Sequence, residues 1–225
     1  MSRILAIDTA TEACSAALLI EGDVKESFVV APREHNERIL PMVDELLSSA
    51  GLGIKQLDAI AFGQGPGAFT GVRVAAGIVQ GLAYAADLPV IGISNLAALA
   101  HYAFRVYQHE KVFTAIDARM DEIYFAAYTV NTEGKLALVI PESVISPENA
   151  TGYEDMSGWV GVGSGWSYSP RIPFKPEVIY KDILPHAQDI ALLGELAWKC
   201  GEAVPPEQAI PVYLRDNVAK KKQER

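Results

Sequence analysis

The chain has 225 residues, half of them apolar, and a formal net charge of -9 at pH 7. This length can bury a sizeable core in one large domain or two smaller ones, and the composition excludes a mostly disordered chain. The negative charge disfavours direct binding to nucleic acid, so any RNA partner is expected to be held through another protein or a local patch.

Cysteine usage and hydropathy indicate the compartment. Cys14 and Cys200 lie far apart in apolar or amphipathic sequence, so we expect buried free thiols in a reducing compartment. No charged leader precedes an apolar core at the start, and polar residues and a proline interrupt the apolar stretch 74–93. These features predict a cytoplasmic protein with no membrane partner, and the basic residues 220–225 are expected to form a solvated tail.

The first half predicts an alternation of strands and helices from its apolar periodicity. The predicted strands cover residues 3–7, 14–20, 24–30, 57–62 and 89–93, and the predicted helices cover residues 37–50, 71–86 and 95–107. Gly51 is expected to end the first helix, whereas Thr70 and Ser94 are expected to cap the next two. Pro41 must fall in the first turn of its helix or kink it.

The second half repeats this order. Residues 6–8 and 115–117 both read Ala-Ile-Asp, and each triplet precedes a turn and a strand; the sequence Gly-Gln-Gly at 63–65 has its counterpart in Gly-Ser-Gly at 163–165. We therefore predict an α/β fold with a duplicated unit, divided into residues 1–108 and 109–225. The amphipathic helix at 186–203 is assigned to the second unit, and residues 211–225 form a tail that can return to the first.

Four motifs carry a family resemblance: IDTAT at 7–11, EHNERILP at 34–41, GPGAFTGVR at 65–73 and PVYLR at 211–215. The two halves resemble the actin, sugar kinase and Hsp70 (ASKHA) superfamily, in which nucleotide sits between the halves. The four motifs together resemble the bacterial TsaB (YeaZ) family. The resemblance implies two duplicated ASKHA-like domains, each a mixed sheet with helices, the first of which carries the partner interface.

The resemblance also implies a function without catalysis. TsaB-type proteins are partners of the TsaD-type catalytic subunit and of the TsaE-type ATPase in forming threonylcarbamoyladenosine at position 37 of tRNA, and pair with themselves when alone. TsaD carries two metal-binding histidines four residues apart, and the matching positions here are Asn95 and Leu99. Leucine cannot bind a metal, so neither a metal site nor catalytic residues are expected. His101 and His109 are read as structural side chains.

The glycine-rich junction has two interpretations. Its backbone can bind an anion at a helix N-terminus, or its glycines can let the loop approach another segment closely. A Walker-type phosphate loop has a lysine after its glycines, and no lysine follows them here. The sequence therefore argues against a dedicated phosphate-binding loop. The candidate nucleotide or anion site, weak or vestigial, comprises Asp8, Thr9, Gly65, Gly67 and Thr70. No cofactor is required, and weak binding of ATP or ADP stays open.

Two aspartates at the predicted hairpin turns also have alternatives. Asp8 either lies near metal and phosphate, as acidic residues of this superfamily do, or caps its turn. For Asp117 the turn role is favoured because Arg119 can neutralise it.

The helix after the glycine loop is apolar almost all round, although a surface helix should show a polar face. Gly77 and Gly81 leave a flat stripe on which another helix can lie closely. We predict a subunit interface made by this helix and the helix at 37–50, with the alternative that the chain's own elements cover both sides. The predicted interface residues are Ile39, Val43, Leu46, Val74, Gly77, Ile78, Gly81 and Tyr84.

The preferred function is therefore that of an activator of a TsaD-type enzyme. The alternative is an ATP-binding phosphotransferase of the actin and sugar kinase superfamily, and a metal-dependent peptidase is less favoured.

Overall fold

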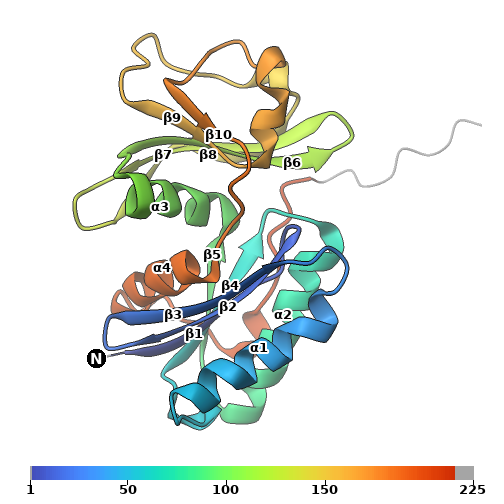
Figure 1. Cartoon of the computed structure of the whole chain (residues 1–225), viewed down its shortest axis with the longest axis vertical. Coiled ribbons are helices and arrows are strands. Elements are labelled where there is room, and N and C mark those ends of the chain that lie inside the picture. Colours follow the sequence, from blue (N-terminus) through green and yellow to red (C-terminus); the bar gives the residue numbers. More distant parts are fainter. Residues whose placement is uncertain (1, 216–225) are drawn as a thin grey trace, which may run out of the picture.

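The first of two five-stranded sheets has the order β3-β2-β1-β4-β5 (Figure 1). The computed structural model describes residues 2–215. The strands are β1 (Arg3–Asp8), β2 (Ala13–Ile20), β3 (Asp23–Val30), β4 (Ala59–Gly65) and β5 (Val90–Ser94). Antiparallel pairs join β1 to β2 and β2 to β3, whereas β1, β4 and β5 run parallel.

The second sheet repeats this topology with the order β10-β9-β6-β7-β8. Its strands are β6 (Lys111–Arg119), β7 (Glu122–Val130), β8 (Leu136–Ile145), β9 (Trp159–Val162) and β10 (Val178–Tyr180). Antiparallel and parallel pairs fall at the same places as in the first sheet. The duplicated ASKHA-like fold predicted from the sequence is confirmed, with β6 in the place of β1.

Within the described residues, four α-helices complete the core. They are α1 (His35–Ser49), α2 (Phe69–Ala86), α3 (Asn95–Tyr107) and α4 (Ala187–Lys199). The short 3-10 helices are η1 (Ile54–Gln56), η2 (Pro147–Asn149), η3 (Ser164–Arg171) and η4 (Pro206–Gln208). The second unit has η2 and η3 after β8 and β9, where the first unit has α1 and α2, so the long pair of helices belongs to the first unit.

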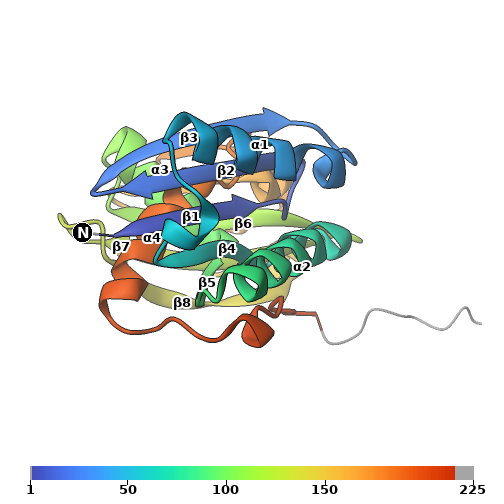
Figure 2. The ribbon, with the colours of Figure 1, turned by 90° about the horizontal axis from the view of Figure 1, so that it is seen from below.

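The elements stack in layers. Helices α1 and α2 cover the outer face of the first sheet and α4 covers its inner face (Figures 1 and 2). Helix α3 covers the face of the second sheet that lies toward α4, and an aromatic cluster with η3 covers the other face. Four apolar clusters fill the spaces between these layers.

The two inner helices are exchanged between the halves. Helix α4 follows the second sheet in the chain, but its Ile190 packs in the cluster of Ile4 from the first sheet. Conversely, α3 follows the first sheet, and its Leu99 packs with Val112 of the second. Assigning helix 186–203 to the second unit was therefore wrong: an apolar stripe shows that a helix is buried, but not against which sheet. The predicted boundary between residues 108 and 109 separates the strands of the two sheets. It does not separate the helices, because α3 and α4 each pack against the sheet of the other half.

The predicted helix ends agree with the structure in part. Ser94 caps α3 as predicted, because its side chain accepts hydrogen bonds from the N–H groups of Leu96 and Ala97. Thr70 does not cap α2: the helix begins at Phe69 with Ala68 as its N-cap, so Thr70 already lies inside.

Two further local predictions hold only in part. Pro41 lies beyond the first turn, inside α1, which begins at His35, so the first-turn placement is wrong and the alternative, a kink at Pro41, stays a prediction. Cys14 is a buried free thiol, as predicted, but Cys200 is exposed at the end of α4.

The C-terminal segment returns to the first unit. Val204 pairs with Val90 at the edge of the first sheet, and the N–H of Val212 donates to the Gln64 carbonyl over 2.7 Å. The basic residues 220–225 lie outside the described residues. Between Ser2 and Arg215, no helix is both long and apolar enough to cross a membrane.

Candidate partner interface and interdomain cleft

The glycine loop presses against the turn between β1 and β2. A Cβ atom on Gly71 would lie 2.1 Å from the Thr9 carbonyl oxygen, and one on Gly67 would lie 2.4 Å from that of Ala10. The N–H of Ala68 donates to the Ala10 carbonyl over 2.7 Å, and the Thr9 hydroxyl donates to the Gly71 carbonyl over 2.7 Å. Of the two interpretations of these glycines, close backbone approach is confirmed.

Asp8 lies fully buried at the end of β1. Its Oδ1 accepts a hydrogen bond of 2.7 Å from the Asn95 amide and one of 3.4 Å from the Ala10 N–H. Asn95 in turn accepts from the Gly65 N–H over 2.9 Å. Burial raises the pKa of Asp8 to about 6, although the bond from Asn95 opposes this rise. The carboxyl group thus ties the turn to the start of α3 and the glycine loop.

A cavity of about 410 Å³ separates the two halves. Of the predicted nucleotide-site residues, Gly67 lines this cavity, whereas Thr70 lines a neighbouring hollow of about 370 Å³. Asp8 and Thr9 are buried and line neither space, and the Gly65 N–H is bonded to Asn95. The five residues therefore do not converge on one cavity, which corrects the predicted grouping.

The hairpin turns of the two halves face each other across this cavity. The Arg119 guanidinium bonds Asp117 over 2.7 Å and Glu12 of the other turn over 2.8 Å. Asp117 also accepts the Arg119 N–H over 2.8 Å, which is the turn-capping role favoured from the sequence. Arg119 thus neutralises Asp117 and bridges the two halves.

The positions that match the metal-binding histidines of TsaD serve the fold here. Asn95 is held by Asp8, and Leu99 is fully buried between α3 and the second sheet. His109 lies 3.1 Å from the Tyr180 hydroxyl, and His101 is bound elsewhere. In the part of the chain that the structure describes, no three His, Cys, Asp or Glu side chains are grouped to hold a metal.

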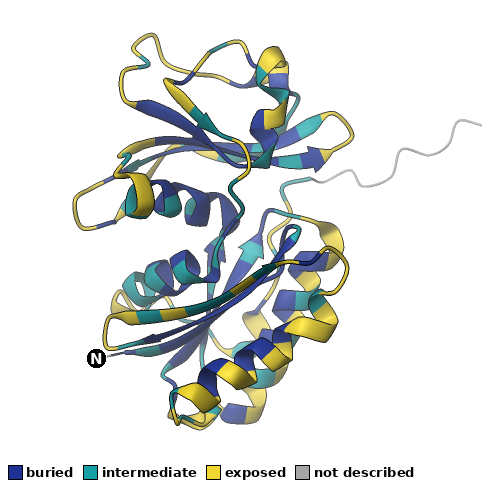
Figure 3. Cartoon of the chain, viewed as in Figure 1, coloured by how far each residue is buried: buried dark blue, intermediate teal, exposed yellow. Residues whose placement is uncertain are grey.

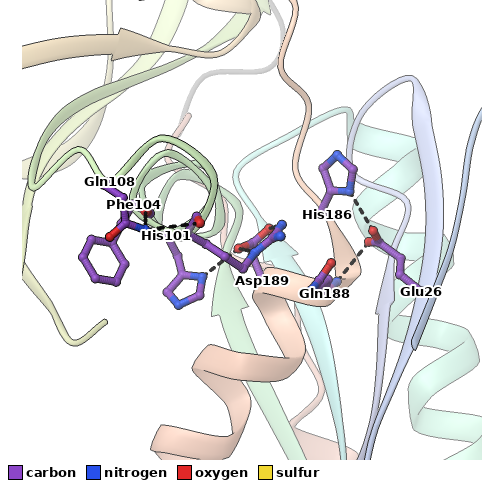
Figure 4. Close-up of polar contacts among 8 residues, drawn as sticks. Glu26, His101, Phe104, Gln108, His186, Gln188 and Asp189 are labelled. Carbon is purple, nitrogen blue, oxygen red and sulfur yellow. Dashed lines mark hydrogen bonds and ion pairs between the residues drawn. The ribbon is translucent and has the colours of Figure 1, made fainter. Parts of the chain in front are cut away.

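A buried polar network joins α3 to α4 (Figure 4). Asp189 of α4 accepts a bond of 2.7 Å from His101 and two of 2.9 Å from Arg105, both on α3. Burial alone would raise the pKa of Asp189, but the bonds from Arg105 and His101 lower it below its usual value. Nearby, Glu26 of β3 contacts His186 over 2.8 Å and the Gln188 N–H over 3.0 Å at the start of α4.

The predicted interface residues of α1 are not at the surface. Ile39, Val43 and Leu46 are at most 7% exposed and pack into the cluster beneath the first sheet. They cannot contact a partner directly, because the apolar stripe of this helix faces its own sheet. The outer face of α1 is exposed (Figure 3). Most of its exposed side chains are polar or charged, with Leu40 as an apolar exception.

The predicted residues of α2 are more accessible. Gly77 and Gly81 are exposed, and a Cβ atom at either position would have no neighbour within 4 Å. Tyr84 is 81% exposed, whereas Val74 and Ile78 are half-buried. Val74, Gly77, Gly81 and Tyr84 share one side of the helix by their spacing. We call these four residues the α2 face.

The sequence prediction missed the exposed side chains next to this face. Phe69, Arg73 and Tyr213 meet where the glycine loop and the C-terminal segment cross. The signal was present, because the motifs GPGAFTGVR and PVYLR each carry an aromatic residue and an arginine.

Curated relatives match almost the whole chain. It is 45% identical to the "tRNA threonylcarbamoyladenosine biosynthesis protein TsaB" of Escherichia coli K12, covering 98% of this chain and 97% of that protein. The protein of the same name from Haemophilus influenzae is 44% identical, covering 97% and 96%. The chain belongs to the TsaB (YeaZ) family.

Further comparisons agree with TsaB membership. The family model TsaD, described as tRNA N6-adenosine threonylcarbamoyltransferase, matches residues 29–223. The solved structure of YeaZ from Pseudomonas aeruginosa is 50% identical and superposes with a TM-score of 0.92, covering 95% of this chain and all of that one. The chain is thus similar both to TsaB proteins and, in its family model, to the catalytic relative.

Proposed function

We propose that this chain is a non-catalytic partner that activates a TsaD-type threonylcarbamoyltransferase in the formation of threonylcarbamoyladenosine at position 37 of tRNA. Its curated relatives carry the name of this biosynthetic route. It acts in the cytoplasm, requires no cofactor of its own, and meets tRNA through the complex. Asn95 and Leu99 support the loss of catalysis, since they stand where the catalytic relative has its metal ligands.

The observation that carries this proposal is the α2 face. Glycine in a helix interior costs about 0.5–1 kcal/mol relative to alanine, and neither Gly77 nor Gly81 has an intrachain neighbour that needs the space. A flat strip between Val74 and Tyr84 allows a second helix to approach closely. The TsaD-type subunit docks here, a second copy docks here when that subunit is absent, and the TsaE-type ATPase binds the resulting complex.

Phosphotransfer receives less support than the partner role. The Asp8 carboxyl group is enclosed by Asn95 and the Ala10 N–H, and it does not line the cleft. Calorimetry with ATP and Mg²⁺ tests this alternative. Micromolar affinity for ATP together with turnover of ATP would contradict the proposal and would favour a kinase.

The main experiment mixes the purified chain with its TsaD-type and TsaE-type counterparts, and measures complex size and tRNA modification. Gly77→Arg is expected to abolish the complex and the gain in modification, because the side chain would fill the strip, while the melting temperature of the isolated chain, measured at a dilution where the wild type is monomeric, is not lowered. Leu138→Arg, on the exposed surface of β8, is the control and should bind normally.

Two results would contradict the proposal in different ways. If the wild-type chain neither binds the TsaD-type protein nor raises modification, the function is wrong. If Gly77→Arg binds as the wild type does, the function stands but the α2 face is the wrong surface.

A further inference from the structure

Phe69, Arg73 and Tyr213 form a compact group that we call the cation–aromatic cluster. The Arg73 guanidinium carbon lies 3.3 Å from the Phe69 ring centroid and 5.1 Å from that of Tyr213. The two ring centroids are 6.3 Å apart. Stacking on one face leaves the N–H edge of a guanidinium available to hydrogen-bond acceptors.

The C-terminal segment holds the cluster in place. Next to Tyr213, the Val212 N–H donates to the Gln64 carbonyl over 2.7 Å, and a Cβ atom on Gly65 would lie 2.8 Å from the Val212 carbonyl oxygen. On the other side, Arg215 donates to the Ala118 carbonyl over 3.1 Å. Tyr213 is therefore fixed between both units before any partner arrives, which lowers the entropy lost on binding.

Folding of the chain alone does not account for this cluster. Phe69 is 55% exposed and Tyr213 is 46% exposed. Arg38, Arg105, Arg119, Arg171 and Arg215 each pair with a carboxylate. Within residues 2–215, Arg73 forms no such ion pair, as is also true of Arg3 and Arg33, although it is exposed and the chain carries an excess of acidic residues. Among the described residues, the positive charge of Arg73 thus has no carboxylate partner beside its two aromatic rings.

The cluster continues the α2 face. Arg73 precedes Gly77 by one helical turn on the same side, and Tyr84 lies further along. The neighbouring hollow of about 370 Å³ is lined by Thr70, Val74 and a second arginine, Arg33. An incoming helix would therefore meet a flat strip, then a positively charged end with a hollow beside it.

We propose, building on the proposed function, that the cation–aromatic cluster anchors the TsaD-type subunit by receiving one of its acidic side chains. A carboxylate accepts two parallel N–H bonds from a guanidinium edge, a geometry that ammonium groups cannot offer. Tyrosine and arginine are enriched among the residues that dominate binding energy, and a carboxylate complements the unmatched charge. The PVYLR segment then serves as part of the docking surface.

The first test compares affinities for the TsaD-type subunit. Tyr213→Ala is expected to weaken binding about 10-fold and Arg73→Glu about 100-fold, with unchanged melting temperatures, and Arg73→Ala should flatten the salt dependence of binding. Arg171→Ala is the control, because Arg171 also lies over an aromatic ring, that of the half-buried Tyr168, but in the second unit. It should bind as the wild type does.

A second test identifies the acidic group directly. In the complex, carbodiimide couples an amine to a neighbouring carboxylate, so Arg73→Lys should give a mass-resolved crosslink to an Asp or Glu of the TsaD-type subunit. Arg171→Lys should give no crosslink to the TsaD-type subunit.

The outcomes separate this inference from the proposed function. If Gly77→Arg abolishes the complex while Arg73→Glu and Tyr213→Ala bind within two-fold of wild type, the cluster is not an anchor, although the function stands. If Arg73→Glu impairs only pairing between copies of this chain, the occupant is a second copy and the inference is overturned. If the wild-type chain does not bind the TsaD-type subunit at all, both fail together.

Discussion

Two glycines of α2 have opposite surroundings. A Cβ atom on Gly71 would lie 2.1 Å from a backbone oxygen, whereas one on Gly77 would meet nothing within 4 Å. We expect Gly71→Ala to lower the free energy of unfolding by more than about 2 kcal/mol, because backbone must move to admit the methyl group. Gly77→Ala should raise it by about 0.5–1 kcal/mol, since alanine favours the helix.

Urea unfolding of both variants and the wild type measures this contrast. A destabilised Gly77→Ala would mean that the open strip on α2 is closed in the free chain, for instance by self-association at the concentration used. Repeating the measurement on diluted protein distinguishes self-association from a destabilisation within the single chain.

The buried Asp8 predicts a pH dependence of stability. Its pKa is raised from 3.8 to about 6 in the folded chain, so the protonated form fits the fold better. The stability it contributes is complete below pH 3.8 and is lost as the pH rises to about 6. Asp8→Asn avoids this loss and should be more stable at pH 7 by up to about 3 kcal/mol.

Unfolding at pH 7 and at pH 4 tests the sign, with the exposed Asp44→Asn as control. The gain from Asp8→Asn should shrink at the lower pH. A variant that is less stable at pH 7 would show that the fold needs the ionised carboxylate.

These residues also show where sequence reasoning stops. The cluster of glycines at the strand–helix junction is visible in the sequence and predicts an unusual backbone there. Close approach could be separated from anion binding only when Thr9 and Ala10 were seen against the loop. The partner of Asp8 is Asn95, which the fold brings to it from far along the chain.

At the scale of elements, the junction of α3 and α4 depends on one buried carboxylate. Asp189→Asn would leave the buried Arg105 guanidinium without its counter-charge, so we expect a loss of about 3 kcal/mol in the free energy of unfolding at pH 7. Because the pKa of Asp189 is lowered, its contribution is present above its unfolded value of 3.8 and fades at lower pH.

Urea unfolding at pH 7 measures this loss, and Arg171→Ala serves as control. Its ion pairs with Asp121 and Glu148 are exposed and screened by solvent, so their loss should change the free energy of unfolding far less than the loss of the Asp189 carboxylate. An equal effect of the two changes would mean that the junction is not held by its buried charges.

Elements were predictable where their signals are local. Alternation and apolar runs place strands, and Ser94 marks the start of α3. The stripe on α1 identified an apolar face, but Ile39 and Val43 face the sheet beneath them rather than a partner. A periodic pattern reports burial and cannot name the covering surface, which is also why α4 was assigned to the wrong sheet.

At the scale of the whole molecule, the repeat was visible because both halves use the same order of strands and turns. The asymmetry between the halves was less visible. The first sheet carries the long helices α1 and α2, and the second carries short 3-10 segments and an aromatic cluster. The docking surface proposed here belongs to the first unit for this reason.

The exchange of α3 and α4 has a consequence for biosynthesis on the ribosome. When β1 to β5 have emerged, the inner face of their sheet lacks its cover until Ala187–Lys199 is made, more than ninety residues later. Helix α3, already made, must likewise wait for the strands it covers. The nascent chain therefore exposes apolar surface until translation is nearly complete, and neither half is expected to survive as a separately expressed fragment.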